Sequence, residues 1–169
     1  MQLADYRPDD LDEVAELFVR VDAAFPPGPG EWWDLQRPGG FARARIVLDT
    51  EYLAAKVVWH GNRIIAFAAL KPADDLGTEM VRVMTDPDFE RLGIARLLVD
   101  SLCAVADTQG IPVWVNVITD DDRNLPGYYE RLGFERFDHP DPPQTMRTCA
   151  QLRRPVDAAA RSITPGLAG

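Results

Sequence analysis

Hydrophobic residues recur along this chain with two different periods. Apolar side chains return every three or four positions over residues 11–21 and again over residues 94–105, and this spacing predicts two amphipathic helices. Other short stretches are rich in β-branched residues or alternate between apolar and polar, and they predict strands. These predicted strands are residues 3–8, 54–59, 64–70, 79–85, 112–118, 134–137 and 145–152. Strands that alternate with helices indicate one α/β domain around a mixed sheet.

Glycine and proline mark where the predicted elements end. Residues 60–63, His-Gly-Asn-Arg, lie between two predicted strands and indicate a β-hairpin. Gly110 follows the second long helix, as a C-terminal cap does. Pro126 and Gly133 bracket a third, short helix. Residues 31–50 show no clear period and stay unassigned.

The limits of the domain follow from the same pattern. The chain has 169 residues, which is enough to bury a hydrophobic core of its own. We expect residues 1–152 to form that domain. We expect residues 153–169, which follow the last predicted strand, to form a flexible C-terminal tail. Trp32-Trp33, in the unassigned region, can be a core anchor or the lining of a pocket.

Composition narrows the classes of partner. Acidic residues outnumber basic ones by 27 to 18, and the net charge of −9 argues against nucleic acid and favours an amine-bearing partner. Two cysteines and two histidines are too few for a disulfide framework or a zinc site of those ligands, so we expect no metal. The longest apolar run, residues 64–70, is far too short to span a membrane, and no signal peptide is evident. We therefore expect a cytoplasmic protein without a membrane partner.

The segment from residue 81 to residue 98 combines a predicted strand, a turn and the start of a helix. Gly93 and Ala95 are small, so the backbone there can approach a ligand closely. Free amides at a helix N-terminus, with Arg91 and Arg96 beside them, favour an anion such as a pyrophosphate. Gly93 can equally serve only to pack the helix against the sheet.

Two motifs resemble the GNAT superfamily of acetyltransferases. Residues 90–95, Glu-Arg-Leu-Gly-Ile-Ala, are similar to its Gln/Arg-x-x-Gly-x-Gly/Ala signature between a strand ending in Asp-Pro and a Leu-rich helix. Glu90 departs from that signature, and we expect its side chain to point outward. Residues 128–134, Tyr-Tyr-Glu-Arg-Leu-Gly-Phe, resemble the family's aromatic-Tyr-x-x-x-Gly-Phe segment. Two motifs in the family's order are far more specific than either alone.

The resemblance implies a fold and a cofactor site. The implied fold is a mixed, mostly antiparallel sheet of about six or seven strands flanked by about four helices. Acetyl-CoA, as co-substrate, would lie in a wedge where the strand ending at Thr85 splays from the strand at 112–118. Main-chain groups at the end of the first strand would pair with the pantetheine arm, and amides of the turn would hold the pyrophosphate. The implied binding residues are Val83, Met84, Thr85, Arg91, Leu92, Gly93, Ile94, Ala95, Arg96 and Asn124.

The resemblance also implies catalytic roles. Tyr129 matches the family's general acid, and Glu79 is placed to accept the proton of the amine. Alternatively, Tyr129 packs beside the sheet and Glu79 is a solvated acid at a strand end. We expect Tyr128 to be the more buried tyrosine. Other candidate acids are Asp74, Asp75 and the cluster at 120–122.

Three functions remain open at this point. The first is an acetyl-CoA-dependent N-acetyltransferase that acts on a primary amine of a small molecule or peptide by direct attack in a ternary complex. The second is an acyl-CoA-binding sensor or regulatory module with weak or lost catalysis, and the third is a structural domain without a cofactor. The acidic balance leans toward polyamine, aminoglycoside-like or basic-peptide acceptors. A homodimer is possible by analogy with the family.

Overall fold

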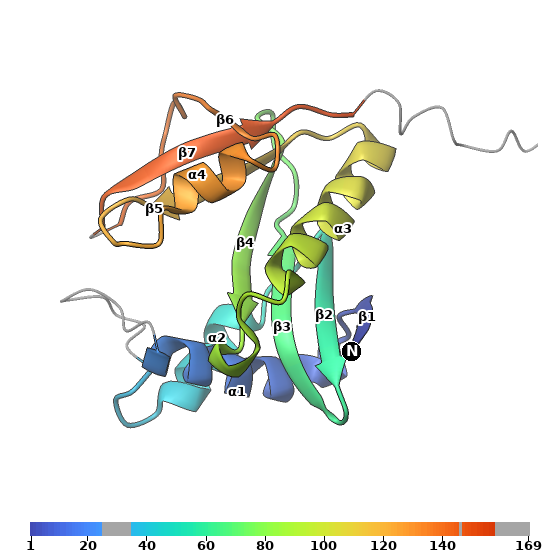
Figure 1. Ribbon diagram of the computed structural model, residues 1–169, viewed down its shortest axis with the longest axis vertical. Helices are drawn as coiled ribbons and strands as arrows, with labels where there is room; N and C mark the ends of the chain where they lie inside the picture. The colour runs from blue at the N-terminus through green and yellow to red at the C-terminus, as the bar shows by residue number, and fades with distance from the viewer. Residues whose placement is uncertain (25–34, 146, 158–169) are drawn as a thin grey trace, which may run out of the picture.

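Strands and helices alternate along the chain in the computed structural model, which describes residues 1–24, 35–145 and 147–157 (Figure 1). The strands are β1 (Gln2–Asp5), β2 (Ala54–His60), β3 (Arg63–Leu70), β4 (Thr78–Thr85), β5 (Val113–Ile118), β6 (Glu135–Arg136) and β7 (Cys149–Arg154). The helices are α1 (Leu11–Ala24), α2 (Gly40–Leu48), α3 (Ile94–Gln109) and α4 (Leu125–Glu130), with 3₁₀ turns η1 (Pro8–Asp10) and η2 (Pro87–Phe89).

The strands form one sheet in the order β1-β2-β3-β4-β5-β7-β6. Neighbours are antiparallel except β4 and β5, which are parallel and joined by α3. The β4–β5 ladder contains only the pairs Thr78–Val113 and Glu79–Trp114. Beyond them the two strands separate, and Figure 1 shows β5 and β7 running across the direction of β4. The sheet is therefore split into two halves that touch at one end.

Hydrophobic clusters cover both faces of the sheet. On one face α3 places Leu98 and Leu102 against β2, β3 and β4. On the other face α1 and α2 contribute Leu17 and Leu48, which join Phe67 of β3. Fully burying a side chain of this size contributes about 1.5–3 kcal/mol. The covering of both faces explains why residues 64–70 are apolar at every position.

The sequence prediction of a single α/β domain with a mostly antiparallel sheet and four helices is confirmed. Helix α2 lies in the region that the pattern left unassigned. Its buried positions are Gly40, Ala44 and Leu48, whereas Phe41 and Ile46 are exposed, so its apolar residues lie all around the helix. The buried stripe carries two small residues and one large apolar one, so the apolar period that predicts a helix from sequence is not evident here. Trp32-Trp33 lies outside the described residues.

The last strand extends beyond the boundary expected at residue 152. Arg154, in β7, donates through both terminal nitrogens to the two carboxylate oxygens of Asp107, each at 2.9 Å. The backbone N–H of Asp157 donates to the same carboxylate at 2.8 Å. Residues 158–169 lie outside the described part of the chain, so the division into a domain and a tail stays a prediction.

Two kinds of feature are absent from the described residues. None of the helices among them combines the length and apolar content needed to cross a bilayer. Within the same residues, no group of three or more His, Cys, Asp or Glu side chains is arranged to hold a metal ion.

Candidate active site

A cavity of about 600 Å³ opens where β4 and β5 separate, and we call it the wedge cavity. Its lining comes from both strands, from the start of α3, from α4 and from the loop before β7. Beyond Glu79, β4 has no ladder partner on the β5 side among the described residues. Unpaired peptide groups at a strand edge can bind an extended ligand as an added strand would.

A β-bulge interrupts β4 inside this cavity. The register with β3 shifts between Phe67 and Ala69, which pair with Met84 and Val81 respectively. Arg82, within the bulge, has a φ of +55°, a conformation that side chains other than glycine rarely adopt. The extra residue turns Val81 and the Arg82 side chain to the same face of the sheet, where the Arg82 guanidinium lies 5.4 Å from the centre of the Phe18 ring.

The turn before α3 presents a row of backbone amides. Arg91 and Gly93 both have positive φ, at +63° and +76°, and the first helical hydrogen bond runs from Leu97 N to Gly93 O. Within the described residues, the amides of residues 91–96 donate to no backbone carbonyl. Successive free amides at the positive end of a 16-residue helix form a concave site for anions. Glu90 is exposed, and the direction of its side chain relative to this row stays a prediction.

A buried carboxylate fixes the same turn to the rest of the fold. Asp86, only 1% exposed, accepts hydrogen bonds from the Asp88 amide at 3.2 Å, from Arg20 Nε at 2.8 Å and from an Arg63 terminal nitrogen. Burial alone would raise the pKa of Asp86. These donors lower it by more than burial raises it, so the pKa lies below its ordinary value. Asp86 therefore stays ionised and ties the turn to α1 and β3. The sequence analysis did not single out this role.

Tyr129 is the buried tyrosine of the adjacent pair, so the expectation that Tyr128 is more buried was wrong. Tyr129 is 6% exposed and packs against the rings of Tyr128 and Phe134 at 5.1 Å and 5.3 Å. The short helix α4 turns Pro126 and Tyr129 inward, one turn apart. Burial, and then Tyr128 and Cys103, raise the pKa of Tyr129 well above its ordinary value. Its hydroxyl has no hydrogen-bond partner among the described residues and stays protonated beside the wedge cavity.

Glu79 lies at the end of the β4–β5 ladder and lines the wedge cavity together with Tyr129. Its side chain is 13% exposed, and its Oε2 lies 2.5 Å from Nζ of Lys71. Two of the other candidate acids are engaged elsewhere, because Asp120 binds Arg147 and Asp121 binds Arg123. Of the acids considered from the sequence, Glu79 is the one that the structure brings to the same cavity as Tyr129.

The remaining predicted residues differ in their surroundings. Val83 and Ala95 line the wedge cavity, whereas Met84 and Ile94 are buried in the core and would contribute only backbone groups. A further set is exposed or partly exposed at the turn and strand end, namely Thr85, Arg91, Leu92 and Arg96.

Asn124 caps α4, and its side-chain oxygen accepts from Gly127 N at 3.3 Å. It lines a separate hollow next to the wedge cavity, together with Asp122. Its contact with a cofactor stays a prediction.

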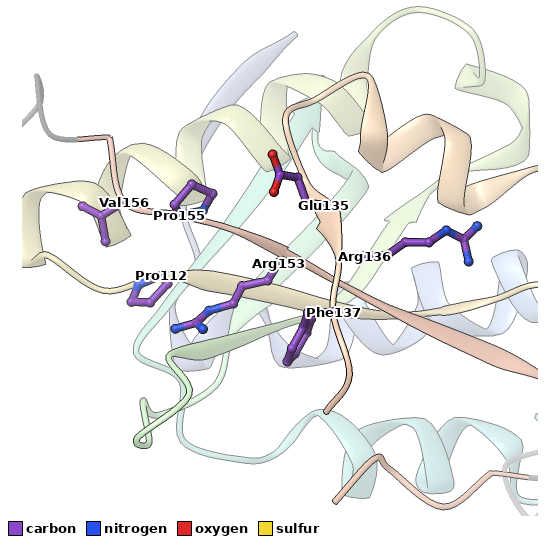
Figure 2. A pocket seen from close by; sticks show the side chains of 7 residues that line it. All are labelled: Pro112, Glu135, Arg136, Phe137, Arg153, Pro155 and Val156. Atoms are coloured by element: carbon purple, nitrogen blue, oxygen red, sulfur yellow. The ribbon is translucent and has the colours of Figure 1, made fainter. Parts of the chain in front are cut away.

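Another hollow, of about 380 Å³, lies at the β6–β7 edge (Figure 2). Pro112, Pro155, Val156 and Phe137 line it, with charged side chains of Glu135, Arg136 and Arg153 around them. Behind it, Trp114 packs against His139 with ring centres 4.6 Å apart. None of the residues singled out by the two motifs lines this hollow, so the wedge cavity is the candidate active site.

Comparison with known proteins agrees with this arrangement. The model of the acetyltransferase (GNAT) family matches residues 14–134, which include both motifs and most of the residues that line the wedge cavity. The chain therefore belongs to the GNAT family of acetyltransferases. No curated protein matches the sequence significantly.

Solved structures with the same fold are distant in sequence. The ribosomal-protein-S18-alanine N-acetyltransferase from Escherichia coli superposes with a TM-score of 0.67 at 18% identity, over 92% of this chain and 93% of that one. A GNAT-family acetyltransferase from Staphylococcus aureus Mu50 gives 0.70 at 14% identity, over 92% and 99%. The PaiA N-acetyltransferase from Thermoplasma acidophilum, in complex with coenzyme A, gives 0.66 at 15% identity, over 92% and 99%. These likenesses concern the fold.

Proposed function

We propose that this protein is an N-acetyltransferase that moves the acetyl group of acetyl-CoA to a primary amine. The observation that carries the proposal is the Tyr129 hydroxyl, protonated and free of partners among the described residues, at a cavity bounded by an unpaired strand edge. A hydroxyl donor at this place can stabilise the thiolate that leaves when the thioester of acetyl-CoA is cleaved. Family membership supports the same reading.

The residues present fit acetyl-CoA. The free amides of residues 91–96 match a pyrophosphate, and the two positive φ values give the turn the concave shape that an anion needs. The β4 edge beyond Glu79 offers peptide groups to the amides of a pantetheine arm. Bound in this way, acetyl-CoA supplies a thioester whose carbonyl carbon is open to attack.

Side chains and backbone amides of this chain then accept the proton and donate the hydrogen bonds that the transfer requires. The amine nitrogen forms a bond to the carbonyl carbon, and the carbon–sulfur bond breaks. Glu79 accepts the proton that the amine loses, directly or through water, and releases it to solvent, and the leaving thiolate takes one proton from solvent water. Because burial makes Tyr129 a weaker acid than a free phenol, it acts mainly as a hydrogen-bond donor that stabilises the leaving thiolate. A backbone amide at Val83 or Met84 can donate to the carbonyl oxygen.

Product formation with a panel of amines tests the proposal. The acetylated acceptor is measured by mass spectrometry, because the partly exposed Cys149 would react with a thiol reagent. We expect product only when protein, acetyl-CoA and an amine are all present. Saturable binding of coenzyme A with no product across a broad panel would instead identify a sensor. No binding at all would leave a structural domain.

A further inference from the structure

A further hollow, of about 470 Å³, adjoins the wedge cavity on the face of the sheet covered by α1 and α2. We call it the α2 hollow. Val47 and Tyr52 lie on its helix side, and Lys71 lies on its strand side. Glu79, Val81 and Arg82 of β4 line both spaces. The two spaces therefore meet at β4, next to the residue that is proposed to receive the proton of the amine.

Arg82 carries a positive charge at this meeting point. Its side chain is exposed to the hollow, and its guanidinium forms no hydrogen bond or ion pair with any described residue. Partial burial of the side chain lowers the pKa of Arg82, whereas Tyr52 and Glu79 raise it. The bulge alone brings this side chain to the α1–α2 face. A strained backbone conformation thus presents an arginine that contacts the Phe18 ring but has no hydrogen-bond or ion-pair partner among the described residues.

The acids of the α2 hollow form no ion pair with Arg82 within the described residues. Glu79 is already paired with Lys71 at 2.5 Å. Glu51, the other acid of the lining, is exposed and makes no ion pair within the described residues. A cationic acceptor would therefore meet a guanidinium without an ion-pair partner beside its amine. A carboxylate would instead accept two parallel hydrogen bonds from it.

From this geometry we infer that the acceptor carries a carboxylate within a few bonds of its reactive amine and that Arg82 binds this carboxylate. The inference rests on the proposed function, because it assumes that the amine lies near Glu79. Two sources share this chemistry, a free α-amino acid and a peptide whose first residue is Asp or Glu. The inference reverses the preference for cationic acceptors that the net charge of the chain suggested. Arg82 is then the residue that selects the substrate class.

Matched acceptors test the inference directly. One set is an α-amino acid, its carboxamide and the amine that lacks the carboxyl group. The other set is a pair of C-terminally amidated peptides that begin with Asp or with Asn. We expect kcat/KM to be at least about tenfold higher for the carboxylate member of one set, and the set identifies the source. Equal rates, or higher rates for the amines without a carboxylate, would overturn the inference and leave the proposed function standing.

Variants assign the preference to Arg82. In Arg82→Gln, we expect the preference to fall below about threefold, mainly through a higher KM for the carboxylate acceptor, and Arg82→Lys to keep part of it. Arg7→Gln removes an exposed arginine that lines neither space and serves as the control. An undiminished preference in Arg82→Gln would overturn the inference. Failure of the wild type to acetylate any amine would overturn the proposed function and this inference together.

Discussion

At the scale of single residues, Tyr128 and Tyr129 are neighbours with different surroundings. Both tyrosines line the wedge cavity, but Tyr129 also belongs to the buried core. Tyr128 is half-buried, and its hydroxyl is enclosed without a hydrogen-bond partner among the described residues. Burial, and then Asp100, raise the pKa of the Tyr128 hydroxyl. Arg96 and Arg131 lower it, but by less, so the net direction is upward. The two hydroxyls therefore offer a matched pair of substitutions next to each other on α4.

Removing the Tyr129 hydroxyl should affect turnover selectively. We expect Tyr129→Phe to lower kcat by about 10²-fold or more, because the leaving thiolate loses its hydrogen-bond donor. The affinity for coenzyme A, measured by calorimetry, should change less than about twofold, since ring packing is kept. Tyr128→Phe is the control, with kcat within about threefold of the wild type. An equal loss of kcat in the two variants would exclude Tyr129 as the specific hydrogen-bond donor to the leaving thiolate.

The acceptor side was not predictable residue by residue. Arg82 follows Val81 in a strand pattern, and the sequence contains no signal that a bulge turns its side chain to the α1–α2 face. The net charge of −9 likewise says nothing of the local charge at β4. By contrast, Tyr129 and Gly93 could be predicted as site residues because local motifs in the sequence carry them.

At the scale of elements, β4 and the turn after it do most to build the site. The strand separates from β5 after Glu79, and the turn presents its amides at the start of α3. Asp86 connects that turn to α1 through Arg20 and to β3 through Arg63. The position of the amide row thus depends on contacts between elements far apart in the sequence.

Loss of the Asp86 carboxylate should loosen this connection. We expect Asp86→Asn to lower the free energy of unfolding by about 2 kcal/mol or more, because two arginines lose a buried partner. The pKa of Asp86 is depressed in the folded state, so its contribution is complete above the unfolded value of about 3.9 and is lost as the pH falls through the folded value.

Urea unfolding at several pH values measures this prediction. The difference between wild type and Asp86→Asn should be constant from about pH 8 to pH 5 and should shrink below about pH 4. Asp88→Asn, at an exposed carboxylate, is the control and should change stability by less than about 0.5 kcal/mol. A difference that grows toward low pH would contradict the assignment.

Elements with a clear period were predictable, and the others were not. Helix α3 buries Leu98, Leu102 and Ala106 on one stripe, and β3 is apolar throughout because both its faces are covered. Helix α2 buries Gly40, Ala44 and Leu48 at the same spacing, but two of these residues are small and large apolar residues lie on other faces. The two-residue strand β6 lies within the strand predicted at residues 134–137, and it pairs with β7. Local patterns thus account for most of the elements but not for α2.

At the scale of the whole molecule, the split sheet separates two binding faces. The amide row and Ala95 lie at the start of α3, on one side, and the α2 hollow lies on the other. The separation of β4 and β5 provides the connection between them. This arrangement would let acetyl-CoA and an amine meet at the same point, as the proposed direct transfer requires.

The C-terminal end of the domain should lie after residue 154. We expect truncation after Asp157 to change the free energy of unfolding by less than about 0.5 kcal/mol. Truncation after Leu152 should lower it by about 3 kcal/mol or more, because Asp107 would be buried without Arg154. Urea unfolding of both truncated chains, with Arg154→Gln in the full chain as a control, measures this. Equal stability of the two truncated chains would place the end at 152.

The proposed function depends on binding of coenzyme A to the amide row at residues 91–96. Two glycines allow a specific test of that binding. Gly93, in the row, and Gly61, in the β2–β3 turn, have φ of +76° and +62°, and an added methyl would meet no atom within 4 Å at either. Alanine at either position should therefore cost a similar amount of stability, about 1–2 kcal/mol. Only at Gly93 would the change alter the amides that face the ligand.

Calorimetric titration of coenzyme A into the wild type, Gly93→Ala and Gly61→Ala is the most direct measurement. We predict saturable binding at one site in the wild type, about tenfold weaker binding in Gly93→Ala and unchanged binding in Gly61→Ala. Absence of saturable heat in the wild type at millimolar coenzyme A, or equal weakening in both variants, would contradict the account.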